Sequence, residues 1–182
     1  MFLSASGQLG GAETSLLEIL ASLRRAEPSW PLQLLVAGEG PLEARAAALG
    51  VGTILLPFDR TVARLGESGA ASGGGWLGFA AQSVRAGPGV AAYLGRMRGA
   101  IRDANPDILH TNGFKMHLLG ARAIARPQGA QARLRPNVVW HLHDYLGSRP
   151  LSARLLRWNR ARCAAVIANS ASVAADARRV LG

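Results

Sequence analysis

The chain of 182 residues has one cysteine, Cys163, and one lysine, Lys115. A single cysteine excludes an internal disulfide and a zinc site built from cysteines, and it suits a reducing compartment. No run of about 18 apolar residues occurs, so the sequence predicts no membrane-spanning helix. The N-terminus has neither the charged nor the apolar region of a signal peptide. We therefore expect a cytoplasmic protein that is soluble or peripheral to the cytoplasmic face of a membrane.

Acidic residues are scarce in the second part of the chain. Residues 1–59 carry three arginines against six acids, a net charge of −3, whereas residues 60–182 carry 18 basic residues against five acids, a net charge of +13. A basic region of this kind suits an anionic partner such as phosphate, an acidic lipid surface or nucleic acid. The alternative is an arginine-rich surface that contacts only water.

Apolar runs of strand length alternate with helical patterns along the chain. Such fully apolar strands are typical of a parallel sheet with both faces covered. The sequence therefore predicts one Rossmann-like, doubly wound α/β domain over residues 1–182, with about six mostly parallel strands and helices on both faces. The expected strands are Phe2–Ala5, Leu32–Ala37, Thr53–Pro57, Asp107–His110, Asn137–His143 and Ala164–Ala168, and the expected helices are 13–26, 41–49, 89–104, 113–125, 150–162 and 171–181.

The segment 60–88 breaks this alternation. Eight of the 24 residues from Gly66 to Gly89 are glycine, a composition typical of loops. We predict a long mobile loop over 60–88, with a short helix near Trp76–Val84.

Ligands of doubly wound sheets bind where the carboxyl ends of the strands meet helix N-termini. Gly10 and Gly11 follow the first expected strand, and two glycines allow backbone N–H groups to approach an anionic ligand. Glu13 is either a substrate contact or a first-turn acid that suits the helix dipole. The turn is neither a P-loop nor a GxGxxG fingerprint.

The fourth expected strand ends in His110, and a helix begins shortly after it. His110 is a candidate substrate-binding residue or, alternatively, a buried histidine. Asn112 is a candidate substrate contact and a predicted N-cap. Lys115 suits a phosphate or a substrate hydroxyl, with a plain surface lysine as the alternative.

The fifth expected strand ends in His141-Leu142-His143-Asp144. Strand alternation places His141 and His143 on one face. A histidine followed by an aspartate can supply an oriented imidazole, so His143 and Asp144 are the candidate catalytic residues. Three ligands from one strand end converge poorly, and we expect no metal site. Asn169 and Ser170, after the last strand, are predicted N-caps and substrate-binding candidates.

Residues 151–162 form a basic amphipathic helix by their spacing. An arginine face with a tryptophan at its edge suits a membrane interface, and an ordinary covering helix is the alternative. The apolar stripe comprises Leu151, Leu155 and Trp158, and the arginines expected on a different side are Arg154, Arg157 and Arg160.

Taken in order, these motifs resemble the N-terminal, acceptor-side domain of GT-B glycosyltransferases of the glycosyltransferase family 4 type. The resemblance spans nearly the whole chain. It rests on GGAETSLLEIL (10–20), VAGEGPL (36–42), PDILHTNGFKMHLLGARAIAR (106–126), PNVVWHLHDYLGSRP (136–150) and AAVIANSASVAADARRVLG (164–182).

The resemblance implies transfer of a sugar, with retention, from a nucleotide-sugar to a cell-surface polysaccharide or glycolipid, without a cofactor or bound metal. It implies that Gly10 and Gly11 approach the donor diphosphate and that His143, with Asp144 after it, faces the transferred sugar. It also implies that the segment 112–115 lines the acceptor side. The donor-binding C-terminal domain would be absent from residues 1–182, which would then be inactive alone.

Two further hypotheses stay open at this point. The chain could be a non-catalytic Rossmann-like module that binds anionic lipid or nucleic acid, although no nucleic-acid-binding motif is present. It could also be half of a GT-B-like sugar-nucleotide epimerase, because such an enzyme would share the fold.

Overall fold

A computed structural model of the chain describes residues 1–59, 62–63, 76–124 and 136–182, with the side chains of 76–86 outside the description. Six strands form one sheet, with every neighbouring pair parallel, as predicted. The strands are β1 (Phe2–Ser4), β2 (Gln33–Val36), β3 (Gly52–Leu55), β4 (Ile108–Asn112), β5 (Asn137–Leu142) and β6 (Ala165–Ala168). The helices are α1 (Gly11–Ala26), α2 (Pro41–Ala48), α4 (Trp76–Ala104), α5 (Phe114–Ala123), α6 (Pro150–Asn159) and α7 (Ala171–Leu181), with 3₁₀ turns η2 (Leu146–Ser148) and η3 (Arg160–Arg162).

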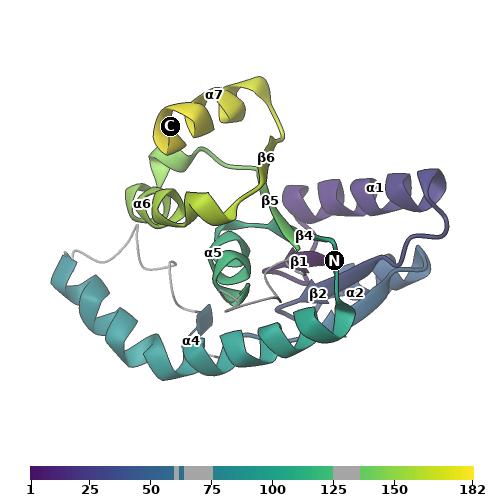
Figure 1. Ribbon diagram of the computed structural model, residues 1–182, viewed down its shortest axis with the longest axis horizontal. Coiled ribbons are helices and arrows are strands. Elements are labelled where there is room, and N and C mark those ends of the chain that lie inside the picture. The colour runs from purple at the N-terminus through teal and green to yellow at the C-terminus, as the bar shows by residue number, and fades with distance from the viewer. Residues whose placement is uncertain (60–61, 64–75, 125–135) are drawn as a thin grey trace, which may run out of the picture.

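The strand order is β3-β2-β1-β4-β5-β6, so the chain moves outward from β1 in one direction and then, from β4, in the other (Figure 1). This reversal lies between β1 and β4, where Ser4 pairs with Asn112. In open α/β sheets, the crevice beside such a reversal is the usual ligand site. The fold therefore directs attention to the carboxyl ends of β1, β4 and β5.

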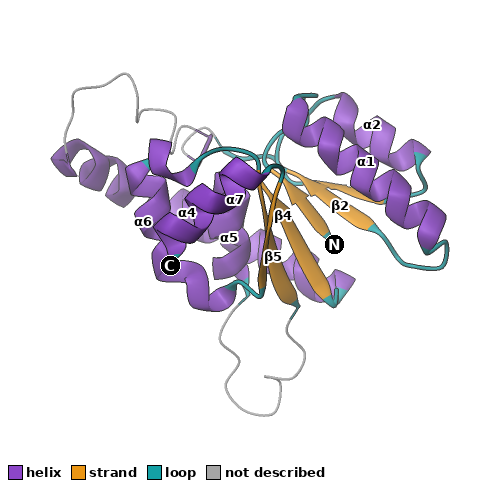
Figure 2. Cartoon of the chain, turned by 90° about the horizontal axis from the view of Figure 1, so that it is seen from above, coloured by secondary structure: helices purple, strands orange, loops and turns teal. Residues whose placement is uncertain are grey.

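Helices cover both faces of the sheet, which confirms the doubly wound prediction. Figure 2 shows α1 and α2 on one side and α4, α5, α6 and α7 on the other. The first pair buries Leu16 and Leu20 against Leu34 and Val36. The second group packs around Trp140, which is fully buried.

The glycine-rich segment differs from its prediction. The short helix predicted near Trp76–Val84 is confirmed, but it is part of one helix of 29 residues, Trp76–Ala104, which continues through Pro88, so 85–88 is not loop. Tyr93, Met97 and Ile101 on this helix are buried in the core. These contacts anchor the part of α4 that follows the proline. Of the loop predicted over 60–88, residues 60–61 and 64–75 lie outside the described residues.

The two edge strands also differ from the prediction that every strand is buried on both faces. Val166 and Ile167 of β6 are 42% and 43% exposed, and Leu55 of β3 is exposed as well. An edge strand has a neighbour on one side only, so apolar sequence alone does not guarantee its burial. The four inner strands largely match the buried pattern, apart from first residues such as Ile108 at the start of β4, which is 46% exposed.

The buried face of α6 is not the stripe that the sequence indicated. Ala153, Leu156 and Asn159 are buried, whereas Leu151 is 41% and Trp158 63% exposed. The Arg154 guanidinium lies 5.0 Å from the centre of the Trp158 ring, so Arg154 shares a side with Trp158 and does not lie apart from it. In the described part of the chain, no helix is long and apolar enough to cross a bilayer.

Candidate functional site

The carboxyl ends of β4 and β5 and the start of α1 meet through the side chain of Asn112. Its Nδ2 donates a hydrogen bond to the backbone carbonyl of Ala12 in the first turn of α1 (3.3 Å). Its Oδ1 lies 2.8 Å from Nε2 of His143. The prediction that Asn112 is the N-cap of α5 is wrong. The N-cap is Gly113, whose φ of +87° suits glycine. The sequence could not show that the Asn112 amide would join β4 by hydrogen bonds to α1 and to the residue after β5.

His143 is half-buried and follows the last residue of β5. Its backbone carbonyl accepts a hydrogen bond from Nδ2 of Asn169 (3.3 Å). Burial lowers the pKa of His143, while the nearby Glu13 and Asp144 carboxylates raise it. Asn112 thus holds the ring at Nε2 and Asn169 holds the main chain, and the lowered pKa makes the ring neutral near pH 7.

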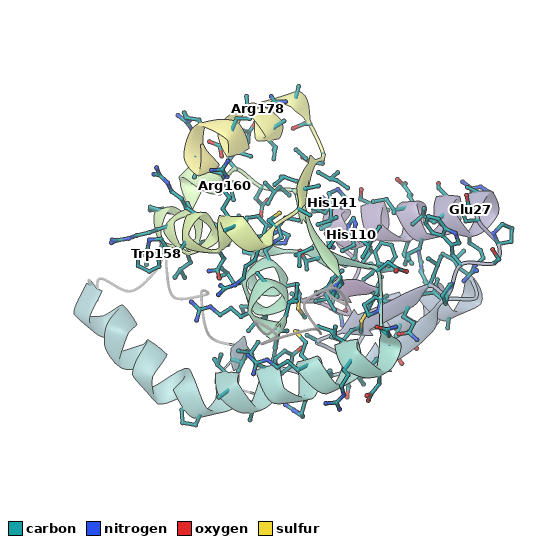
Figure 3. All side chains as sticks on the ribbon, viewed as in Figure 1. Glu27, His110, His141, Trp158, Arg160 and Arg178 are labelled. Atoms are coloured by element: carbon teal, nitrogen blue, oxygen red, sulfur yellow. The ribbon has the colours of Figure 1, made fainter. Side chains whose placement is uncertain are left out.

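Three histidine rings form a row on this face of the sheet. His141 and His143 have ring centres 4.1 Å apart, and His110 and His141 have ring centres 5.2 Å apart. Their common face confirms the predicted alternation, and Figure 3 shows His110 and His141 side by side. His110 and His141 are 6% and 3% exposed. Burial lowers the pKa of His110 to about 3 and that of His141 to about 4.

The position of His110 matches the alternative that the sequence left open. It is stacked beside Phe2, with 4.9 Å between ring centres, and lies two residues before Asn112 on the same strand face. His110 is therefore a buried neighbour of the site, and its contact with substrate stays an untested prediction.

The glycine turn before α1 is held by Glu13. The N–H of Gly10 donates to Oε2 of Glu13 (3.2 Å), which gives the carboxylate a capping role at this helix start. Gly11 is the first residue of α1, and an added Cβ there would meet nothing within 4 Å. The turn and His143 are linked through Ala12 and Asn112.

Two further glycines shape this edge, and the sequence interpretation did not assign them a role. The loops after β1 and β2 touch backbone to backbone: a Cβ on Gly40 would overlap the carbonyl of Gly7, and a Cβ on Gly7 would overlap the carbonyl of Gly38. The N–H of Leu42 also donates to the carbonyl of Gly7 (3.0 Å). The spaced glycines of SGQLGG and AGEGP were the sequence signal from which this contact between the two loops could have been predicted.

Lys115 lies in the first turn of α5, as predicted, and is half-buried. Its ammonium donates to the carbonyl of Ala63 and lies 5.6 Å from the centre of the Phe58 ring. These contacts tie α5 to the segment after β3. Lys115 is therefore not a plain surface lysine, because its ammonium contacts neighbouring elements.

The remaining predicted residues border His143. Asp144 is exposed and forms an ion pair with Arg149 (Oδ2 to Nη2, 3.6 Å). Ser170 is the N-cap of α7, accepting from the N–H of Val173 (3.2 Å), whereas Asn169 is not a cap and binds His143 instead. In the described part of the chain, no group of three or more His, Cys, Asp or Glu side chains is placed to hold a metal ion.

Comparison with solved structures shows the same fold. Anabaena Alr3699/HepE in complex with UDP and glucose matches with a TM-score of 0.62 and 20% identity, over 100% of this chain and 40% of that one. The apo lipopolysaccharide outer core galactosyltransferase WaaB matches with a TM-score of 0.61 and 11% identity, over 98% and 41%. This chain thus spans about two fifths of the length of these proteins.

No curated protein matches the sequence. The family model described as Glycosyltransferase Family 4, however, matches residues 9–182, nearly the entire chain. That range includes the glycine turn, Asn112, His143 and the cap of α7. The chain therefore belongs to Glycosyltransferase Family 4.

Proposed function

We propose that residues 1–182 are the acceptor-side half of a retaining glycosyltransferase that moves a hexose from a nucleotide-sugar to a cell-surface polysaccharide or glycolipid. The observation that carries this proposal is the link from the α1 turn through Asn112 to His143, at the carboxyl ends of β4 and β5 beside the strand-order reversal. Family membership supports sugar transfer as the reaction class. The HepE structures with UDP, and with UDP and glucose, support a nucleotide-sugar donor.

In this proposal, each residue at the edge has a separate task. His143, neutral and oriented, hydrogen-bonds the transferred sugar, and Asp144 lies beside it as the neighbouring charge. The α1 turn at Gly10 and Gly11 offers backbone N–H groups to the donor diphosphate, with Glu13 shaping the turn. Asn112, Lys115, Asn169 and Ser170 border the acceptor side.

A second, donor-binding domain completes the proposed enzyme, because the chain spans only about 40% of its structural neighbours. Oriented groups on one side of a sugar supply only part of the electrostatic environment that the transition state needs. Residues 1–182 alone should therefore bind acceptor without transferring sugar. No cofactor is needed in this scheme, so chelation of divalent cations should leave the rate unchanged.

The assay follows sugar transfer from a panel of labelled nucleotide-sugars to a lipid and polysaccharide extract. The protein is this chain followed by a donor-binding domain. His143→Ala should lower the rate by at least roughly 100-fold, the scale of a positioned catalytic group, while Trp30→Ala, at an exposed site before β2, is the matched control. Loss of nucleotide-sugar binding altogether in the two-domain protein would contradict the proposal. Interconversion of the nucleotide-sugar without acceptor would instead indicate an epimerase.

We also propose peripheral contact of α6 with acidic lipid on the cytoplasmic membrane face. Support comes from the exposed Leu151 and Trp158 beside Arg154, with Arg157 and Arg160 also exposed. Apolar side chains that enter the interface and arginines that meet lipid phosphates are the two components of interfacial binding. Such contact would bring the site close to a lipid-linked acceptor.

Vesicle sedimentation tests this contact. Binding to vesicles with anionic lipid should exceed binding to neutral vesicles, weaken with salt, and fall several-fold in Trp158→Ala. Trp30→Ala is again the control, since Trp30 is also an exposed tryptophan (44%, against 63% for Trp158) but precedes β2 and does not lie on α6. Equal binding to both vesicle types would count against the membrane contact, and a salt-dependent shift with nucleic acid instead would favour the nucleic-acid module.

A further inference from the structure

The orientation of the Asn112 amide is fixed by a partner that can only accept. The carbonyl oxygen of Ala12 has no proton, so the group facing it at 3.3 Å must be the NH₂ of Asn112. The Oδ1 atom therefore faces His143. Turning the amide over would place its oxygen against the Ala12 carbonyl oxygen and would lose a hydrogen bond in a side chain that is 2% exposed.

This orientation determines which nitrogen of His143 carries the proton. Oδ1 of Asn112 is an acceptor, and Nε2 of His143 lies 2.8 Å from it, so that contact is a hydrogen bond only when Nε2 bears the proton. A neutral imidazole has one proton on its two nitrogens. The other nitrogen, Nδ1, then carries a lone pair.

We propose that Asn112 is a positioning residue that holds His143 as the Nε2–H tautomer and leaves Nδ1 as a hydrogen-bond acceptor for a substrate hydroxyl. The chain of bonds runs from the carbonyl of Ala12 in α1, through the amide in β4, to the ring after β5. Nδ1 makes no hydrogen bond to another residue in the described part of the chain. The assignment of a sugar hydroxyl as its partner rests on the proposed function, whereas the tautomer does not.

The surroundings of the ring agree with a neutral tautomer. His141 is stacked against it on the buried side, and burial lowers the pKa of both rings. Two carboxylates, those of Glu13 and Asp144, act on His143 in the opposite direction. The backbone bond from Asn169 holds the main chain of His143 without touching the ring nitrogens.

The consequence for sugar transfer is that Nδ1 of His143 selects sugars that have a hydroxyl group able to donate to it. A lone pair at Nδ1 accepts a hydrogen bond from a hydroxyl of a bound sugar, and a sugar that lacks that hydroxyl leaves the acceptor without a partner. Sites built on such a bond discriminate strongly between substrates with and without the hydroxyl. Asn112 would therefore contribute to substrate specificity by acting through His143, without itself touching the substrate.

The test is nitrogen NMR of residues 1–182 labelled with ¹⁵N-histidine, without any ligand, at neutral pH. The chain has four histidines, and His143→Gln identifies the signals of His143. We expect wild type to show the Nε2–H tautomer in about tenfold or greater excess, the ratio that corresponds to one well-formed hydrogen bond. A predominant Nδ1–H tautomer in wild type would overturn the proposal whatever the variants do.

Two variants of Asn112 and one control variant test whether the hydrogen bond from Asn112 sets the tautomer of His143. Asn112→Leu removes the acceptor, so the tautomer ratio should fall several-fold toward that of a free histidine. Asn112→Asp keeps an acceptor for Nε2 and adds charge, so the tautomer should persist and the pKa of His143 should rise. The same variant loses the donor to the Ala12 carbonyl, so its stability should fall. Asn169→Ala, which removes only the backbone contact, should leave the tautomer unchanged. An unchanged ratio in folded Asn112→Leu would also overturn the proposal, and a correct tautomer together with no sugar transfer by the two-domain protein would contradict the proposed function alone.

Discussion

At the scale of single residues, the histidines of the sheet make stability depend on pH. Burial lowers the pKa of both His110 and His117 to about 3, whereas in the unfolded chain each titrates near 6.5. Between these values, the unfolded state binds more protons than the folded state. Stability is therefore fully present above about pH 6.5 and is lost as the pH falls toward 3.

The first prediction follows from this difference. Between pH 7 and pH 5, the free energy of unfolding should fall by about 2 kcal/mol for each of these two histidines. Urea denaturation at pH 7, 6 and 5 measures the change. His117→Asn, which retains a polar atom near Thr111 and removes one proton site, should reduce the slope by about a third, because burial also lowers the pKa of His141 to about 4 and this ring contributes a similar amount. A free energy of unfolding that is level across this range would show that the rings are not buried as neutral groups.

The second prediction concerns the contact between the first two loops. Gly40→Ala forces a methyl group into the backbone of Gly7, so it should destabilise the fold by about 1–3 kcal/mol, as overpacking does. Gly11→Ala, at an open helix position, should be neutral or stabilising by up to about 1 kcal/mol. Thermal unfolding of the two variants compares them directly. Equal melting temperatures would mean that the loops do not touch.

At the scale of elements, sequence patterns predicted each inner strand and most helices because apolar periodicity reports burial in a parallel sheet. The sequence predicted a short helix near Trp76–Val84 and a separate helix over 89–104, and α4 joins them. Their continuity was not predicted because glycine and Pro88 lower helix propensity, and packing of Tyr93, Met97 and Ile101 outweighs that local preference. The face of α6 was misjudged for a different reason. Helical spacing groups Leu151 with Trp158, but it does not say which apolar stripe meets the core.

The third prediction separates the two faces of α6. Leu156→Ala should destabilise the fold by about 2–5 kcal/mol, because Leu156 is fully buried. Leu151→Ala should change stability by no more than about 0.5 kcal/mol, because Leu151 is largely exposed. Denaturant midpoints give both values. If Leu151→Ala destabilised the fold more than Leu156→Ala, the core face of α6 would be the stripe with Leu151 that the sequence indicated.

The site was predicted in part for similar reasons. Strand alternation was sufficient to place His141 and His143 together, and the expected carboxyl-end edge contains Asn112, His143 and Asn169. The bonds among them depend on which strands become neighbours and on the direction of an amide, and neither is written in local sequence. The backbone contact of Gly7 with Gly40 has the same origin, since it joins loops that are 33 residues apart.

At the scale of the whole molecule, the positive charge is concentrated in one part of the sequence. The chain before residue 60 is net negative and the rest is strongly positive, and the exposed arginines of α6 belong to the positive part. The carboxyl ends of β1 and β4, between which the strand order reverses, lie beside the start of α1. We infer that one surface of the domain can meet an anionic membrane while the edge of the sheet meets the sugar substrates.

The most direct test of this account is the rate of sugar transfer from labelled nucleotide-sugars, measured for residues 1–182 alone and for the same residues followed by a donor-binding domain. The account predicts no transfer by the first protein. It predicts transfer by the second, with the rate unaffected by chelation of metals and reduced at least roughly 100-fold by His143→Ala. A two-domain protein that binds no nucleotide-sugar, or one whose transfer rate is the same with and without His143, would contradict the account.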